Sequence, residues 1–266
     1  MSEELSREEV TAAVDRAVED LLRAAGTAGP PVDAIALAQR HLGMVVCLDR
    51  DQPQRGRAQR GAGRKQIFLR PEPTEERHQW TVAHEIGEHF KASLLAHLGV
   101  GPEQTRAMTG ESLANLFATH LLVPLGWFAG DARAAGHDLL ELKKRYATAS
   151  HEVLALRLLD LPEPCIITVV DNDHVHRRRS NAWRVRRELE APERECQKYV
   201  NHFSRPRVVC ADGWTVQVCP ENLLLVGHPG VADEAAARDR LNHLGLLTAN
   251  CLRIEFGPAP TAFTEV

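Results

Sequence analysis

The sequence predicts an α+β protein, in which a mainly helical N-terminal part with a small sheet precedes a smaller α/β C-terminal part. Apolar residues recur at helical spacing through most of the first part, beginning with residues 6–25. From Pro164 the pattern changes to β-branched and alternating runs, of which CIITVV at 165–170 is the first. We therefore place a boundary near residue 161 and expect two domains, residues 1–160 and 161–266.

The N-terminal part should begin with two helices and two strands. Helical spacing predicts a helix over 6–25, ended by a Gly- and Pro-rich linker, and a shorter helix over 32–42. The apolar stretches 44–48 and 66–69 predict strands. The Gln-, Arg- and Gly-rich residues 50–64 between them predict a loop or an exposed hairpin.

Helices should make up the rest of this part. Thr74 suits the N-cap of a long helix over 74–99, and Glu75 and Glu76 suit its positive start. A polar loop separates it from a second helix, GESLANLFATHLL at 110–122, which ends before Pro124. Three shorter helical segments are expected after that proline, at 125–134, 138–146 and 150–160.

The C-terminal part should mix strands with two helices. Strands are predicted at 165–170 and 251–256, and the stretch 207–219 alternates on both sides of Asp212-Gly213, which is a hairpin signal. The two helices are expected at 191–203 and 231–244.

Composition excludes several classes of protein. The 266 residues carry a net charge of −4, so no overall basic field indicates direct binding of nucleic acid. No run of about 18 apolar residues predicts a membrane span, and the acidic start MSEELSREEV does not resemble a signal peptide. The six cysteines contain no C-x-x-C pair, so we expect reduced thiols and a cytoplasmic location.

The stretch HEIGEH at 84–89 differs by one residue from the His-Glu-x-x-His pattern of zinc hydrolases. Because an α-helix turns about 100° per residue, His84 and Glu88 lie about 40° apart, whereas His84 and His89 lie about 140° apart. A straight helix therefore favours Glu88 as the second metal ligand. A π-bulge, made easier by Gly87, would bring His89 round instead. Both alternatives stay open at this point.

The remaining groups of a metal site are also present. In either register Glu85 directly follows the first ligand, where such sites keep the base that takes a proton from bound water. Glu111 on the next helix can supply a third ligand. Asn115, one turn on, can orient it. The competing interpretation is a solvated helix face with an ordinary first-turn glutamate on the next helix.

These residues carry a resemblance to a known family. Residues 77–87 read R-x-x-W-T-V-A-H-E-I-G, and residues 111–124 read E-x-x-A-N-x-F-A-x-x-L-L-x-P. Together they resemble the paired motifs of the ImmA/IrrE family of metallo-endopeptidases, and the resemblance covers roughly residues 30–160. It implies a zincin-like peptidase domain over 1–160, which includes the N-terminal helix. Residues 161–266 resemble no family that we can name, although longer members carry a GAF-like domain there; we expect an α/β domain with a sensory or regulatory role.

The resemblance also implies an activity. His84 would be the first metal ligand, Glu85 the general base and Glu111 the third ligand, while Glu88 falls on the position of the family's second histidine. The substrate would be a regulatory protein, usually a helix-turn-helix transcriptional repressor. One divalent metal is expected, with zinc favoured; a His/Glu/Glu set lets manganese or iron compete better. The alternative is a weakly active or inactive member that acts as a metal-containing binding or sensor protein.

A basic cluster lies in the C-terminal part. Arginine occupies positions 177, 178, 179, 184, 186 and 187. We interpret the cluster as a solvated hairpin edge, with an acidic partner surface or nucleic acid as the alternative. We expect a protein substrate, no direct contact with nucleic acid and no membrane.

Overall fold

The computed structural model describes residues 6–51, 56–61, 64–72, 74–99, 110–171, 174–203, 207–219, 224–229, 253–256 and 264–265; for some residues within these ranges, including Glu111 and nearly all from 207 onward, it describes only the backbone. The chain forms two compact units. Unit 1 comprises Met1–Asp131 and Lys143–Ser150, and unit 2 comprises Ala132–Leu142 and His151–Val266. The domain boundary expected at residue 161 stays a prediction.

Helices make up most of the N-terminal half of the chain. They are α1 (Arg7–Ala24), α2 (Ala34–Ala36), the π-helical η1 (Leu37–His41), α3 (Glu75–His97), α5 (Gly110–Leu122), α6 (Leu125–Ala134) and α7 (Leu139–Arg145). Ser6 and Glu9 form a capping box at the start of α1, which explains why the helix begins there. The helix expected over 32–42 is a single α-turn followed by a π-turn. The apolar spacing predicted a helical segment here but not its π-helical turn.

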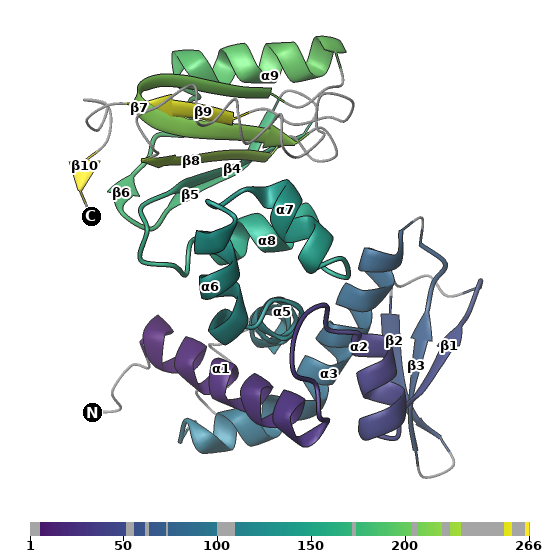
Figure 1. The fold of residues 1–266 in the computed structure, drawn as a ribbon. Coiled ribbons are helices and arrows are strands. Elements are labelled where there is room, and N and C mark those ends of the chain that lie inside the picture. Colours follow the sequence, from purple (N-terminus) through teal and green to yellow (C-terminus); the bar gives the residue numbers. More distant parts are fainter. Residues whose placement is uncertain are drawn as a thin grey trace. The chain divides into compact units, whose positions relative to one another are not determined.

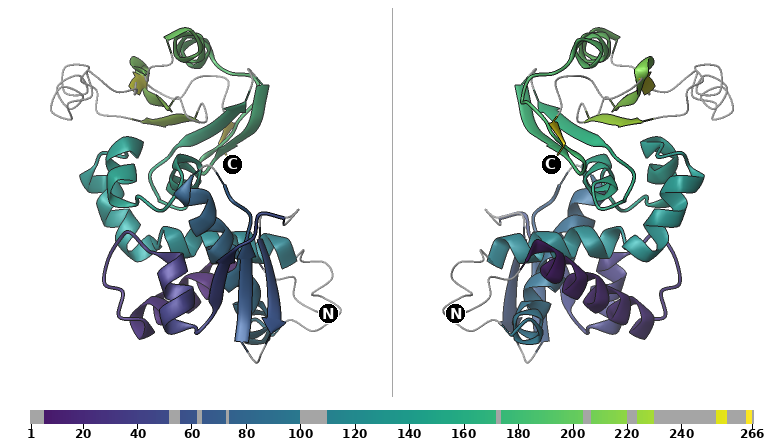
Figure 2. Two further views of the ribbon diagram at one scale, coloured as in Figure 1. Left: turned by 90° about the vertical axis from the view of Figure 1, so that its right-hand side faces the viewer. Right: turned by 90° about the vertical axis from the view of Figure 1, so that its left-hand side faces the viewer.

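A three-stranded sheet lies beside α3 in unit 1 (Figures 1 and 2). Its strands are β1 (Val45–Leu48), β2 (Gly56–Gly61) and β3 (Arg64–Leu69), in the order β1-β3-β2. β1 runs parallel to β3, and β2 pairs with β3 as an antiparallel hairpin. Within the stretch 50–64, for which a loop or an exposed hairpin was expected, residues 56–61 form the first strand of a hairpin, and β2 forms an edge of this sheet.

The core of unit 1 is centred where α3 and α5 pack together. Val82 and Ile86 from α3 are fully buried, as are Phe117 and Leu121 from α5. No single helix in the described ranges is long and apolar enough to cross a membrane. One bent pair, Ser112–Leu122 with Leu125–Ala134, meets that criterion on length and composition alone.

Unit 2 contains a five-stranded sheet with α9 (Ala191–Phe203) packed against β7, as Figure 1 shows. The strand order is β5-β4-β8-β7-β9, where β4 is Ile166–Asp171, β5 His174–Ser180, β7 Arg207–Cys219, β8 Leu224–Pro229 and β9 Arg253–Phe256. A separate pair joins β6 (Trp183–Arg184) to β10 (Thr264–Glu265), and α8 (His151–Leu158) precedes β4. The combination of helices with small sheets confirms the α+β class.

The hairpin expected within 207–219 is wrong. These residues form one strand, β7, and the glycine at its centre marks an irregularity in the pairing with β9, between Val209 and Trp214. Glycine within a strand often marks a bulge and not a turn, and sequence alternation does not separate the two. The helix expected at 231–244 lies outside the described residues.

A buried ion pair connects α9 to the sheet of unit 2. The guanidinium of Arg178 on β5 donates to both carboxylate oxygens of Glu193, at 2.5 and 2.9 Å, and to the hydroxyl of Thr168 at 2.6 Å. The two charged side chains are only 3% and 6% exposed. Such a bidentate pair fixes the position of α9 because loss of either partner leaves a buried charge.

Candidate active site

The HEIGEH stretch lies in the middle of α3, which is α-helical without interruption from Glu75 to His97. The π-turn of this chain is instead at Leu37–His41. On a regular helix His84 and Glu88 share one face, and His89 points about 140° away from His84. The geometry of the helix is therefore that of the straight-helix alternative.

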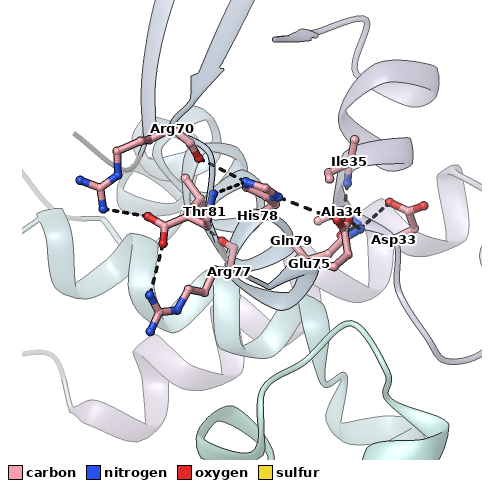
Figure 3. A network of polar contacts seen from close by, with 10 residues as sticks. Asp33, Ala34, Ile35, Arg70, Glu75, Arg77, His78, Gln79 and Thr81 are labelled. Carbon is pink, nitrogen blue, oxygen red and sulfur yellow. Dashed lines mark hydrogen bonds and ion pairs between the residues drawn. The ribbon is translucent and has the colours of Figure 1, made fainter. Parts of the chain in front are cut away.

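Buried hydrogen bonds anchor the first turns of α3 to α2 (Figure 3). The side-chain oxygen of Gln79 accepts the backbone N–H of Ala34 at 2.7 Å and that of Ile35 at 3.4 Å. Its amide nitrogen donates to Asp33 at 3.0 Å and to Glu75 at 3.3 Å. Gln79 thus satisfies donors at the start of α2 that have no partner within that helix.

A second set of contacts holds the chain just before α3. The Glu72 carboxylate is only 3% exposed and accepts from the guanidinium groups of Arg70, at 2.9 Å, and Arg77, at 3.2 Å. The Glu72 backbone N–H donates to Nε2 of His78 at 3.1 Å. Both networks fix how α3 is rotated about its axis, which determines where His84 points.

His84 is held from two sides. Its Nδ1 lies 2.9 Å from the side-chain oxygen of Asn115 on α5, and its ring stacks on Trp80, with centroids 5.5 Å apart. An amide oxygen can only accept a hydrogen bond. Nδ1 must therefore carry the proton, and in the neutral ring the lone pair lies on Nε2. This is the tautomer that a metal ligand binding through Nε2 requires.

The helices α3 and α5 approach closely at Gly87. A Cβ placed on it would lie 3.0 Å from Cα and O of Ala114 and 3.0 Å from Cβ of Phe117. Sequence analysis gave Gly87 a role in deforming the helix. In the structure the helix stays regular, and the missing side chain lets α5 approach closely enough for Asn115 to reach His84.

Glu85 is buried, with 9% of its surface exposed, beside the edge strand β2. A Cβ on Gly56 would lie 2.3 Å from Thr81 Cγ2 and 3.6 Å from Glu85 Oε1. The ammonium of Lys65 on β3 donates to the backbone oxygen of Glu85 at 3.0 Å. Gly56 and Lys65 were not predicted. Lys65 lies two residues before the buried Ile67, on the same face of β3, so strand alternation could have indicated its direction.

The two alternatives for the second ligand have different surroundings. The Glu88 carboxylate is 33% exposed and forms an ion pair with Lys91 at 3.4 Å. His89 is exposed and lies edge-on to Phe90, with ring centroids 5.4 Å apart. Phe90 in turn stacks on Phe117 of α5, at 5.6 Å.

The candidate ligands are of types that bind divalent metals. His84 presents an Nε2 lone pair, Glu88 lies one turn further on the same face of α3, and Glu111 lies in α5 one turn before Asn115, which contacts His84. Among the side chains that the structure describes, no three His, Cys, Asp or Glu gather into a metal-binding group, and the side chain of Glu111 lies outside that description.

His120, which the spacing along α5 places away from Glu111, has a different partner. Its Nδ1 lies 2.7 Å from the carboxylate of Asp15 on α1, and its side chain is 1% exposed. This contact ties α5 to α1 and contributes nothing to the group around His84.

Comparisons with known proteins match part of the chain to a family and most of the chain to the fold of a solved structure. Residues 39–159 match the family Peptidase M78, described as the IrrE N-terminal-like domain. Among solved structures the chain is similar to a Mycobacterium tuberculosis transcriptional regulator, with a TM-score of 0.59 and 18% identity; the match covers 91% of this chain and 85% of that one. At this identity the likeness shows the fold alone. No curated protein matches the sequence.

Proposed function

Since residues 39–159 belong to the IrrE N-terminal-like peptidase family, we propose that this chain is a metal-dependent endopeptidase that cleaves a regulatory protein. The observation that carries the proposal is the crossing of α3 and α5. It brings Asn115 within 2.9 Å of His84, next to the buried Glu85, with Glu111 one turn away along α5.

Each residue then has a chemical role. His84, Glu88 and Glu111 would hold the metal, and His84 would bind it through Nε2 because Asn115 occupies Nδ1. A divalent metal, when bound by these residues, would supply Lewis-acid chemistry at this position. Glu85 takes the proton of the attacking water and passes it to the leaving amine.

The edge strand β2 offers a place for an extended substrate. Its outer side has no strand neighbour within the described residues, and Gly56 lies directly against Thr81 and Glu85. An extended peptide can add to such an edge through main-chain hydrogen bonds. The scissile bond would then lie beside Glu85, and Lys65, which contacts the Glu85 backbone, would add positive charge near the reacting carbonyl.

We further propose that the substrate is a helix-turn-helix transcriptional repressor and that the metal is zinc, manganese or iron. The proposal about the substrate rests on the usual substrates of the ImmA/IrrE family. The structural neighbour's name, a transcriptional regulator, supports a regulatory setting. The proposal about the metal rests on the His/Glu/Glu ligand set, which is chemically harder than a set of two histidines and one glutamate.

The test compares cells that express the wild-type chain, Glu85→Gln or Glu8→Gln, in the organism that encodes the protein. Protein N-termini are identified by mass spectrometry. We expect new N-termini, within regulatory proteins, for the wild-type chain and for the exposed-helix control Glu8→Gln, and none for Glu85→Gln. The purified Glu85→Gln chain should keep its metal. Equal cleavage by Glu85→Gln would refute its role as the base.

A second candidate is a binding or sensor protein without efficient catalysis. The observation that favours it is the ion pair of Glu88 with Lys91, since a carboxylate neutralised by lysine is a weaker ligand than the histidine usual at that position. This candidate predicts that the wild-type and Glu85→Gln chains cause the same changes in gene expression without any new N-termini.

A further inference from the structure

Positive charge is concentrated in one short segment of unit 2. Residues 174–187 contain six arginines and no acidic residue, although the whole chain has a net charge of −4. The remaining residues therefore sum to −10. Segregation of this kind points to an anionic partner when the charges are exposed and not already neutralised within the fold.

Two of the six arginines are neutralised within unit 2. Arg178 is buried and forms the bidentate pair with Glu193. Arg177 lies 3.6 Å from the carboxylate of Glu152, and both of these side chains are more than a third exposed. These two residues serve the fold, and Arg179 also has an interaction within it, so all three are left out of the surface considered below.

The other three arginines form the basic ridge: Arg184, Arg186 and Arg187, all exposed. Trp183 and Val185 alternate with the ridge residues and pack against the core of unit 2. Extended chain sends alternate side chains to opposite sides, so Arg184 and Arg186 point away from that core. Among the side chains that the structure describes, no carboxylate forms an ion pair with Arg184, Arg186 or Arg187.

The ridge lies beside an edge strand of unit 2. The guanidinium of Arg187 donates to the backbone oxygen of Val175 at 3.0 and 3.3 Å. This contact places the segment after β6 next to β5, which is itself at the edge of the five-stranded sheet.

The main chain within this surface accepts an additional strand. β10 pairs with β6 in antiparallel register, with Thr264 opposite Arg184 and Glu265 opposite Trp183. This pairing is only two residues long, and β10 shares no sheet with any other strand in the described part of the chain. A partner strand with more pairs and more acidic residues would bind β6 more strongly.

We propose that the basic ridge, together with β6, is a docking site for an acidic, extended segment of another protein. The segment adds to β6 as an antiparallel strand in place of β10, and its carboxylates lie on the three arginines. One observation favours a polypeptide over a nucleic acid: β6 already pairs with a polypeptide strand, and an extended peptide adds to such a strand through main-chain hydrogen bonds. This proposal does not depend on peptidase activity.

The test measures binding of a fluorescein-labelled peptide of six Glu-Thr repeats to the full-length chain by fluorescence anisotropy. Arg184→Glu/Arg186→Glu should weaken binding by about tenfold or more, since two exposed attractions become repulsions. Arg23→Glu/Arg40→Glu changes the net charge equally on exposed residues of unit 1 and should leave binding unchanged. Thr264→Pro/Glu265→Pro removes β10 pairing and should tighten binding.

The outcomes are distinguishable. Equal loss of binding in both charge-reversed chains would show a nonspecific charge effect and overturn the proposal. Tighter binding of a 20-nucleotide single-stranded DNA, lost in Arg184→Glu/Arg186→Glu, would assign the ridge to nucleic acid instead. If that variant does not fold, Arg184→Gln/Arg186→Gln replaces it, with an expected loss of about threefold. Hydrogen exchange should show protection of the Trp183 and Arg184 amides by the peptide, and the absence of protection would also overturn the proposal.

Discussion

Replacing Gly87 by alanine tests whether the close approach of α3 and α5 builds the site. The added methyl group would lie 3.0 Å from two backbone atoms of Ala114 and from Cβ of Phe117. Carbon atoms in favourable contact are about 3.5–4.0 Å apart. Because these neighbours are backbone and Cβ atoms, they cannot rotate away. The two helices must separate by about half an ångström.

The expected cost follows from two opposing terms. Alanine in place of glycine stabilises a helix interior by about 1 kcal/mol, whereas overpacking of a close-packed core costs about 1–3 kcal/mol. With rigid atoms on the other side we expect a net loss of about 1–2 kcal/mol. The same separation would stretch the 2.9 Å contact between His84 and Asn115 to about 3.4 Å, beyond a good hydrogen bond.

The assay combines urea unfolding with metal titration. Gly130→Ala is the matched control, since Gly130 lies within α6 and a Cβ there meets nothing within 4 Å. The control should gain about 0.5–1 kcal/mol and keep its metal affinity, while Gly87→Ala should lose in both measurements. If Gly87→Ala is as stable as the control and binds metal equally well, the packing role assigned to Gly87 is wrong.

Three further predictions concern other contacts. Asn115→Leu should weaken metal binding by about 10–100-fold, measured by calorimetric titration, whereas Asn115→Asp retains an acceptor for His84 and should bind nearly as the wild type; equal affinities in both would refute the positioning role. Glu193→Ala leaves Arg178 buried without its carboxylate and should cost unit 2 about 3–5 kcal/mol in urea unfolding. Burial, with smaller contributions from Asp160 and Glu163, raises the pKa of Cys165 to about 12. Its thiol is therefore protonated throughout the range below that value, and at pH 8 iodoacetamide should label the half-buried Cys47 but not Cys165 in the folded chain.

Local periodicity was sufficient to predict most helices of the fold. The long helix was expected at 74–99 and is observed at 75–97, because its apolar residues, its acidic first turn and its N-cap position all indicate the same element. Strand pairing was harder. β7 was read as a hairpin because alternation on both sides of Asp-Gly fits a turn as well as a bulge, and β8 was not predicted.

The geometry of the candidate site could be predicted where it depends on one helix. It could not be predicted where it depends on contacts between separate elements. The spacing of His84, Glu85 and Glu88 follows from helix geometry alone. Asn115 was expected to orient Glu111, its neighbour one turn away, but the structure places its oxygen on His84, 31 residues earlier. Gln79 and Lys65 make similar long-range contacts. No short-range pattern encodes such contacts, because they arise only when separate elements pack together.

Metal content of Glu88→Ala and His89→Ala, measured after gel filtration of the full-length chains, tests the central claim most directly. Because α3 is a regular helix, Glu88 faces the same side as His84, whereas His89 points elsewhere. We predict about one metal per wild-type chain, loss of most metal in Glu88→Ala, and near-complete retention in His89→Ala. Retention in Glu88→Ala together with loss in His89→Ala would contradict the account and place a bulge in α3.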